Sequence, residues 1–362
     1  MFVAWRDLKF AKGRFALMGT VIVLITLLVG LLSGLTAGLG QQNISAITSL
    51  PANQIAFDAP SSGQDISYAN STVTEQQWQQ WAKATGVISA EPLGITTTKA
   101  IAGNKSTGVS AFGVQPGSAL APDSNNIDDQ SAVLSTTAAD DLGVSPGDSF
   151  TLAGQKVTVA AVSGDASFSH TPVIWTSLGT WQQVAPPTGK SDKPVATAIA
   201  LNTTSGADIG ATDEAADTKT VSLDDSLSAI GSYTSENGSL QLMRGFLFAI
   251  SALVIGAFFT VWTIQRNGDV AVLKALGAST ANLLKDALGQ AVVLLAGGTL
   301  IGTGIAAGLG ALVSGSAVPF LLTPTSVLVP AAVMIALGAI GAALSIRRIT
   351  SVDPLTALGS VR

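Results

Sequence analysis

Three long stretches without a charged side chain constrain the fold of this chain more than any other feature. They cover residues 15–57, 245–265 and 287–346. A helix that crosses a bilayer needs about 20 consecutive apolar residues. In soluble domains about a quarter of the residues are charged, whereas only 11% are charged here. The stretches therefore predict membrane-spanning helices.

The third stretch is long enough for two spans. Gly315, Pro319 and Pro324 lie near its middle, and both residue types disfavour a continuing helix. The predicted spans are residues 15–39, 245–264, 287–313 and 326–346, with a short loop at 314–325. A cleaved signal peptide is the alternative for the first 40 residues. Its apolar region would cover about 7–15 residues, less than the stretch found here.

Charge sets the expected orientation of these spans. The segments before the first span, between the second and third, and after the fourth hold ten basic and four acidic residues, whereas residues 41–240 hold seven lysines and nineteen acidic residues. Basic loops stay on the cytoplasmic side. We therefore expect a multi-pass protein of the cell membrane with both termini in the cytoplasm. The alanine-, glycine- and threonine-rich composition suggests an actinobacterial source.

The insert between the first two spans, residues 40–244, is predicted to be an extracytoplasmic domain. It alternates strand-like and helix-like segments, so the expected fold is an α-helical four-span bundle carrying a large mixed α/β domain. Cysteine is absent, which excludes disulfides and thiolate metal sites. Thr72 or Thr74 is expected to cap a helix whose Trp78 and Trp81 share one face and lie in the core rather than against a ligand.

Catalytic and nucleotide-binding motifs are missing from the sequence. There is no Gly-x-x-x-x-Gly-Lys-Ser/Thr loop and no His-Glu-x-x-His motif. The single histidine, His170, is interpreted as a structural or solvated loop residue, with ligand contact as the alternative. The acidic pair Asp128/Asp129 and the group Asp213, Glu214 and Asp217 are interpreted as solvated surface.

The loop between the second and third predicted spans, residues 265–286, carries the most informative motif. Its segment Gln265–Ser279 reads QRNGDVAVLKALGAS, an amphipathic, helix-forming insert between two apolar runs. It resembles the coupling helix of the MacB/FtsX-like ABC permeases, with Asp269 in place of the usual glutamate.

Three further segments resemble that family. Residues 1–14 form an expected amphipathic cytoplasmic helix, although a plain basic anchor is an equal alternative. Residues 142–162 resemble the family's outer-domain hairpin, with strands expected at 150–152 and 156–162. The tail, residues 347–362, has a basic pair followed by Asp353-Pro354-Leu-Thr-Ala-Leu.

Glycines four residues apart mark helix faces that allow close packing. They are Gly30, Gly34 and Gly38 in the first span, and the pairs Gly298/Gly302 and Gly304/Gly308 in the third. Packing within one chain explains them, and the family resemblance implies a homodimer seam as the alternative.

The resemblance implies a non-catalytic permease subunit that works with two copies of a separate cytoplasmic ABC ATPase. As a homodimer, it would convert ATP hydrolysis on that partner into movement outside the membrane, a mode called mechanotransmission. A simple surface position for the loop is the alternative to docking on the ATPase. The coupling residues implied by the resemblance are Arg266, Asp269, Leu273, Lys274, Leu276 and Gly277.

Length, span number and the lack of a fused ATPase resemble the haem-exporting HrtB permeases of this family. Haem as substrate would need an axial ligand and a partner for its propionates. The expected contacts are Phe57, Tyr233, Glu236, Met243 and Arg244, each of which could instead serve packing or headgroup anchoring. A lipoprotein or lipid permease, an antimicrobial-peptide or macrolide exporter, an FtsX-like regulator of a cell-wall hydrolase, and a membrane-anchored enzyme remain alternatives.

Overall fold

The computed structural model describes residues 12–186, 195–265, 268, 272, 276–313 and 318–349. The chain forms two compact units. The helical unit comprises the chain up to Gly38 and from Ser239 onward, and the sheet unit comprises Leu39–Gly238. The expected helix at residues 1–14 and the expected tail motif around Asp353 fall almost entirely outside the described residues.

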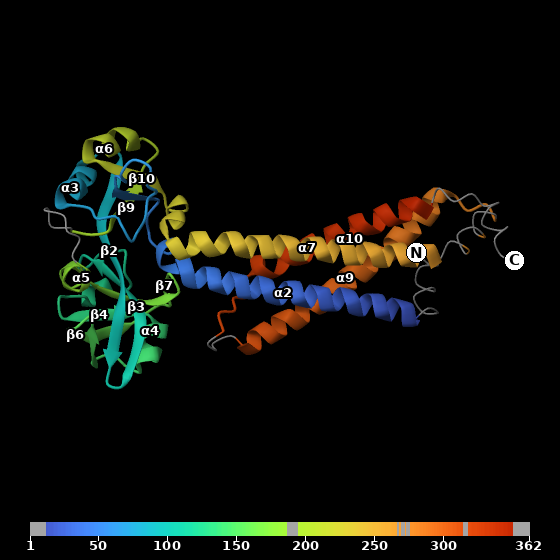
Figure 1. Ribbon diagram of the computed structural model, residues 1–362, viewed down its shortest axis with the longest axis horizontal. Coiled ribbons are helices and arrows are strands. Elements are labelled where there is room, and N and C mark those ends of the chain that lie inside the picture. Colours follow the sequence, from blue (N-terminus) through green and yellow to red (C-terminus); the bar gives the residue numbers. More distant parts are fainter. Residues whose placement is uncertain are drawn as a thin grey trace. The chain divides into compact units, whose positions relative to one another are not determined.

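Four long apolar helices are present among the described residues, as predicted, and each is long and apolar enough to cross a membrane. Figure 1 shows them side by side in the helical unit. They are α2 (Lys12–Thr48), α7 (Gly231–Gln265), α9 (Thr280–Val313) and α10 (Pro324–Ile349). The break between α9 and α10 falls where the glycine and prolines predicted it. Thr323 caps α10, since its Oγ1 accepts from the Ser326 N–H at 3.0 Å.

All four helices are longer than the apolar spans predicted, and α2 and α7 exceed them most. The first continues past Leu39 to Thr48, and the second begins at Gly231 rather than at Gly245. The added turns, residues 40–48 and 231–244, are polar but contain no proline. Hydropathy measures the part of a helix that suits a bilayer, whereas the helix itself continues as long as its backbone and side chains allow. Both helices therefore pass from the helical unit into the sheet unit without a break.

Close glycine contacts hold the helical unit together. A Cβ at Gly302 of α9 would lie 2.6 Å from the Val23 carbonyl oxygen and 2.8 Å from the Thr26 Cβ of α2. Gly30 of α2 meets Ala306 in the same way, and Gly34 and Gly38 meet Phe320 and Pro319. Packing within one chain is thus confirmed for these glycines. Gly304 and Gly308 have no neighbour within 4 Å at the Cβ position among the described residues.

Gly302→Val is expected to loosen the contact between α2 and α9. The added methyl groups would collide with the α2 backbone, and overpacking of this kind costs about 1–3 kcal/mol. The measurement is the apparent melting temperature of the detergent-purified protein. Gly297→Val is the matched control on the same helix, because nothing lies within 4 Å of its Cβ position. Equal melting temperatures for the two variants would contradict the expected contact.

The sheet unit is built on one ten-stranded sheet whose long strand β2 (Val87–Ala102) runs through both of its parts. The strand order is β10-β1-β9-β2-β3-β8-β4-β6-β5, with β7 paired to β8 and an extra pairing between β2 and β5. The remaining strands are β1 (Gln54–Asp58), β3 (Lys105–Val114), β4 (Ser131–Leu134), β5 (Ser149–Leu152), β6 (Gln155–Val162), β7 (Ser167–Phe168), β8 (Thr171–Ser177), β9 (Ala198–Thr203) and β10 (Thr218–Ser222).

Short helices cover the two parts of this sheet (Figure 1). The part with β9 and β10 carries α3 (Glu75–Lys83) and α6 (Ile209–Ala216). The part with β3, β4 and β6 carries α4 (Thr136–Leu142) and α5 (Leu178–Val184). Two 3-10 turns, η1 (Ser124–Asn126) and η2 (Asp225–Ala229), complete the unit. The predicted mixed α/β domain is therefore present between the first two long helices.

Local signals in the sequence placed two of these elements correctly. Thr74 caps α3 in a reciprocal capping box with Gln77. Trp81 is fully buried and Trp78 partly so, and the Trp78 Nε1 donates to the Ala90 carbonyl oxygen at 2.8 Å. Both therefore serve packing, as predicted. The hairpin of β5 and β6 is also confirmed, with antiparallel pairing from Ser149 to Thr158.

Candidate functional site

The coupling loop is described only in part. Arg266, Asp269, Leu273 and Lys274 lie outside the described residues. Leu276 and Gly277 are described and follow the turn at Val272, whose carbonyl oxygen accepts the Leu276 N–H at 3.0 Å. Gly277 has φ +92°, a left-handed conformation that ends a helical turn. Leu276 is 79% exposed. An apolar side chain is thus presented at the end of a turn, outside the core of the helical unit.

The expected haem contacts other than Phe57 all lie on α7. Tyr233 is half-buried and packs against the core of the sheet unit. Met243 is 50% exposed. The Nε of Arg244 is enclosed and has no hydrogen-bond partner among the described residues. The helix therefore has a half-exposed thioether at Met243 next to a partly enclosed guanidinium at Arg244.

Phe57 does not fit the role expected of it. It lies on β1 with no exposed surface, and its ring meets that of Tyr68 edge to face at 4.8 Å. Burial raises the pKa of that Tyr68 hydroxyl well above its ordinary value. The two rings belong to an aromatic core that continues through Phe168 and Phe112 to Trp175. A ring enclosed in this way offers no face to stack on a ligand.

The acidic residues interpreted as solvated surface are exposed except for the half-buried Asp213, and three of them also hold local structure. Asp129 accepts from the Ser177 hydroxyl at 2.6 Å. Asp213 accepts from both hydroxyls of Thr218 and Thr220 and from the Thr220 N–H. Hydrogen bonding by Ser131 and by the Gln130 N–H holds the pKa of Asp128 below its ordinary value. Within the described ranges, no group of three or more potential metal ligands comes together.

His170 is at the centre of a polar cluster that the sequence did not reveal. It forms the turn between β7 and β8 with Ser169, and both residues have positive φ, +62° and +49°. Its Nε2 lies 2.7 Å from the Glu236 Oε2 of α7. A carboxylate oxygen accepts, so Nε2 carries the proton and donates to Glu236. The same Nε2 lies 3.1 Å from the Asn43 Nδ2 of α2.

Two serines complete this cluster. The Ser232 hydroxyl of α7 donates to the Asn43 Oδ1 at 2.7 Å and lies 2.8 Å from the Ser169 hydroxyl. The residues Asn43, Ser169, His170, Ser232 and Glu236 are called the His170 cluster below. Glu236, one of the expected haem contacts, lies in contact with His170 in this structure. The one available signal in the sequence was the uniqueness of His170, because its partners lie 66 and 127 positions away.

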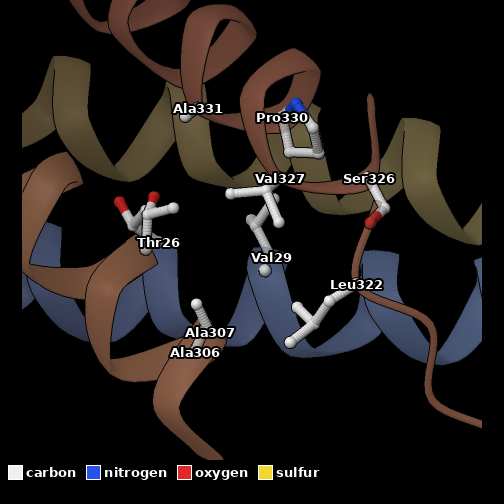
Figure 2. A pocket seen from close by; sticks show the side chains of 11 residues that line it. Thr26, Val29, Ala306, Ala307, Leu322, Ser326, Val327, Pro330 and Ala331 are labelled. Carbon is white, nitrogen blue, oxygen red and sulfur yellow. The ribbon is translucent and has the colours of Figure 1, made fainter. Parts of the chain in front are cut away.

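The helical unit has a small cavity between α2, α9 and α10 (Figure 2). Thr26, Val29 and Ala306 line it together with Val327 and Pro330. Its volume of about 10 Å³ suits one water molecule and no larger ligand. Thr26 is 2% exposed, and its hydroxyl has no hydrogen-bond partner among the described residues. The cavity is therefore too small to hold a macrocycle.

A wider groove follows α7 and α10 on the surface of the helical unit. It measures about 400 Å³ and is lined by Ala252, Gly256, Thr260, Leu337, Ile340, Gly341 and Leu344. The Thr260 hydroxyl donates to the Gly256 carbonyl oxygen at 2.8 Å. This lining offers apolar contact and no side chain that ligates iron.

Comparisons with known proteins match nearly the whole chain. The model of the MacB-like periplasmic core domain matches residues 15–219, and that of the FtsX-like permease C-terminal domain matches residues 242–354. A permease of Staphylococcus epidermidis named HrtB, after a hemin transport system, is 28% identical over 99% of both chains. A namesake from Staphylococcus haemolyticus is 26% identical over 100% of both. An uncharacterized ABC transporter permease of Mycobacterium tuberculosis is 26% identical over 99% of both.

Solved structures of related outer domains are more distant. The periplasmic region of MacB from Actinobacillus actinomycetemcomitans aligns with a TM-score of 0.36 at 14% identity, covering 50% of this chain and 94% of that one. The extracellular domain of the transporter YknZ aligns with a TM-score of 0.34 at 16% identity, covering 47% of this chain and 99% of that one.

Proposed function

We propose, on the premise that this chain belongs to the family of MacB-like and FtsX-like ABC transporter permeases, that it is the membrane subunit of an ATP-driven haem exporter. The permease subunit is a non-catalytic membrane component, and an ABC ATPase associates with it. The proposal adds the substrate, the orientation and the stoichiometry. Two ATPase copies would act on a permease homodimer with its termini in the cytoplasm and the sheet unit outside the cell membrane.

The observation that carries the haem proposal is the full-length similarity to permeases named for hemin transport. That similarity covers 99% of both chains, so it includes the sheet unit as well as the long helices. The named substrate of those relatives is an amphipathic macrocycle that partitions into membranes. A permease for it needs a surface site beside the bilayer rather than a closed pocket, which agrees with the one-water size of the cavity between α2, α9 and α10.

Residues of α7 would form this site. Tyr233 and Glu236 belong to the part of α7 in the sheet unit, and Met243 and Arg244 to the part in the helical unit. Met243 is half-exposed and can offer its thioether to iron, and Tyr233 can offer a phenol. The guanidinium of Arg244 can pair with a propionate. Glu236 would be free for a ligand only after leaving His170.

ATP hydrolysis on the partner subunit would act on the permease through the coupling loop. Arg266, Asp269, Leu273, Lys274, Leu276 and Gly277 would dock in a groove of the ATPase subunit, with the leucines as apolar anchors and the charged residues as orienting contacts. The exposure of Leu276 supports this assignment. The chain itself would bind no cofactor, and ATP with Mg²⁺ would be held by the partner.

Titration of the purified permease with haemin tests the substrate and its site. We expect a defined Soret shift, and we expect Met243→Ala to weaken haemin binding about tenfold or more because an iron ligand is lost. Tyr233→Phe would reveal a phenolate ligand by altering the shift. Leu242→Ala is the matched control, since Leu242 is a similarly exposed neighbour. A spectrum of free haemin for the unsubstituted protein would remove haem as substrate and leave a lipid or peptide permease.

A further inference from the structure

The structure points to an inference about the His170 cluster: we propose that His170 is a positioning residue that couples α2 and α7 to the β7–β8 hairpin. Movement of the two helices would then be delivered to the sheet unit. This inference rests on the proposed function in one respect, namely that ATP hydrolysis on a partner moves these helices. It does not depend on which substrate is exported.

Backbone contacts attach the hairpin to the end of α2. The N–H groups of Ser169 and His170 donate to the carbonyl oxygens of Asn43 and Gln42 at 3.0 and 3.1 Å. One turn further along α2, the Ser45 hydroxyl bonds both the N–H and the carbonyl oxygen of Ser167. The hairpin is therefore joined to α2 through four hydrogen bonds that leave little freedom to slide.

Side chains add α7 to this attachment. His170 Nε2 reaches Glu236 at 2.7 Å, and Ser232 reaches Asn43 at 2.7 Å. The His170 imidazole and the Ser169 hydroxyl are the two side chains of the turn that contact α7, and the imidazole Nε2 also lies 3.1 Å from the Asn43 Nδ2 of α2. Asn43 is 2% exposed, and its Oδ1 accepts from the Ser232 hydroxyl of α7. Without the imidazole, Ser232 would still join α7 to α2. Among the contacts of the cluster, only the one between the Ser169 and Ser232 hydroxyls would then join α7 to the hairpin turn.

The turn is held in a conformation that non-glycine residues adopt at a cost. Two consecutive residues, Ser169 and His170, have positive φ, and such residues persist where surrounding contacts determine them. The turn leads directly into β8, which pairs with β3 on one side and with β4 on the other. A displacement of the turn is thus passed to the middle of the sheet.

Chain continuity connects the cluster to the membrane. Asn43 lies on α2 and Glu236 on α7, and each helix continues without interruption from the sheet unit into the helical unit. A rotation or a relative shift of the two helices that reaches Asn43 and Glu236 would change the distances within the His170 cluster or move the hairpin. If the distances within the cluster stay fixed, the hairpin moves with the helices. If they can change, the helices move and the hairpin does not follow.

Hydrogen–deuterium exchange of the full permease–ATPase complex tests this coupling, measured with and without ATP plus vanadate. In the unsubstituted complex, nucleotide is expected to change exchange in β7, β8 and the first turns of α7. In His170→Ala, exchange at the start of α7 is expected to rise about tenfold without nucleotide. The nucleotide-dependent change in β8 should be lost, while ATP hydrolysis stays within about twofold. His170→Gln, whose amide can donate to Glu236, should restore part of the change.

Gln155→Ala, at an exposed position of the β5–β6 hairpin, should leave all exchange unaltered. The inference is overturned if His170→Ala keeps the full nucleotide-dependent change of exchange in β8. It is also overturned if nucleotide does not change the exchange of β8 in the unsubstituted complex. Failure of haemin binding alone, with the exchange pattern as expected, would count against haem and not against the coupling role.

Discussion

Replacing Leu276 by aspartate is expected to separate the permease from its ATPase subunit. Leu276 is 79% exposed at the end of a helical turn that Gly277 terminates. An exposed apolar anchor that fills a partner's groove contributes about 2 kcal/mol or more to binding, and a carboxylate in that groove would lose its hydration as well. The affinity should fall about thirtyfold or more. Co-purification of the tagged ATPase with the permease measures the loss directly.

Two variants of the same loop serve as controls for this prediction. Leu276→Met keeps an apolar side chain of similar volume and should retain the ATPase. Ser279→Asp adds the same charge at an exposed position nearby, so it separates a general charge effect from loss of the anchor. Retention of the ATPase by Leu276→Asp, at the level of Leu276→Met, would mean that this loop lies at the membrane surface without docking.

Gly113→Val is expected to destabilise the sheet unit strongly. Gly113 on β3 lies opposite Gly94 on β2, and Trp181 of α5 covers both. A Cβ at Gly113 would lie 2.5 Å from the Trp181 Cβ and 2.7 Å from its Cγ. Trp181 is 4% exposed, and its Cβ is fixed to the backbone of α5, so relieving the clash would require α5 to move. We expect a loss of about 3 kcal/mol, at the upper end for overpacking.

Gly108→Val on the same strand is the matched control for this substitution. Its Cβ would meet only the Thr171 Cγ2, at an ordinary 3.8 Å. Thermal unfolding followed by tryptophan fluorescence should give a melting temperature several degrees lower for Gly113→Val than for Gly108→Val. Equal melting temperatures would show that α5 is not held against the glycine pair as the structure has it.

The long helices could be predicted because a single physical requirement, apolar length without charge, determines them. The ends of α2 and α7 could not, since the polar segments 40–48 and 231–244 carry no hydropathy signal and their helical state depends on packing in the sheet unit. Thr74 and Gln77 form a capping box within four residues, and such short-range patterns are visible in a sequence. The strand order of the sheet depends on distant pairings and was not predictable.

The candidate site shows the same division between local and distant information. The coupling motif is contiguous, so its resemblance to the permease family could be recognised from residues 265–279 alone. The expected ligand contact of Phe57 is wrong because β1 is buried on both faces, and the sequence of one strand does not tell what covers it. The interpretation of His170 as a loop residue agrees with its place in the β7–β8 turn, but its partners, Asn43 and Glu236, come from helices far along the chain and are not visible in the local sequence.

The most direct test of the central claim is haemin extraction from proteoliposomes that contain the permease and its ATPase. Transfer of haemin from the bilayer to an external apo-myoglobin would be followed by its Soret band while ATP hydrolysis is recorded in the same sample. Export predicts transfer that requires ATP, together with a hydrolysis rate that haemin changes. Transfer at one rate with and without ATP, during continuing hydrolysis that haemin does not affect, would contradict it.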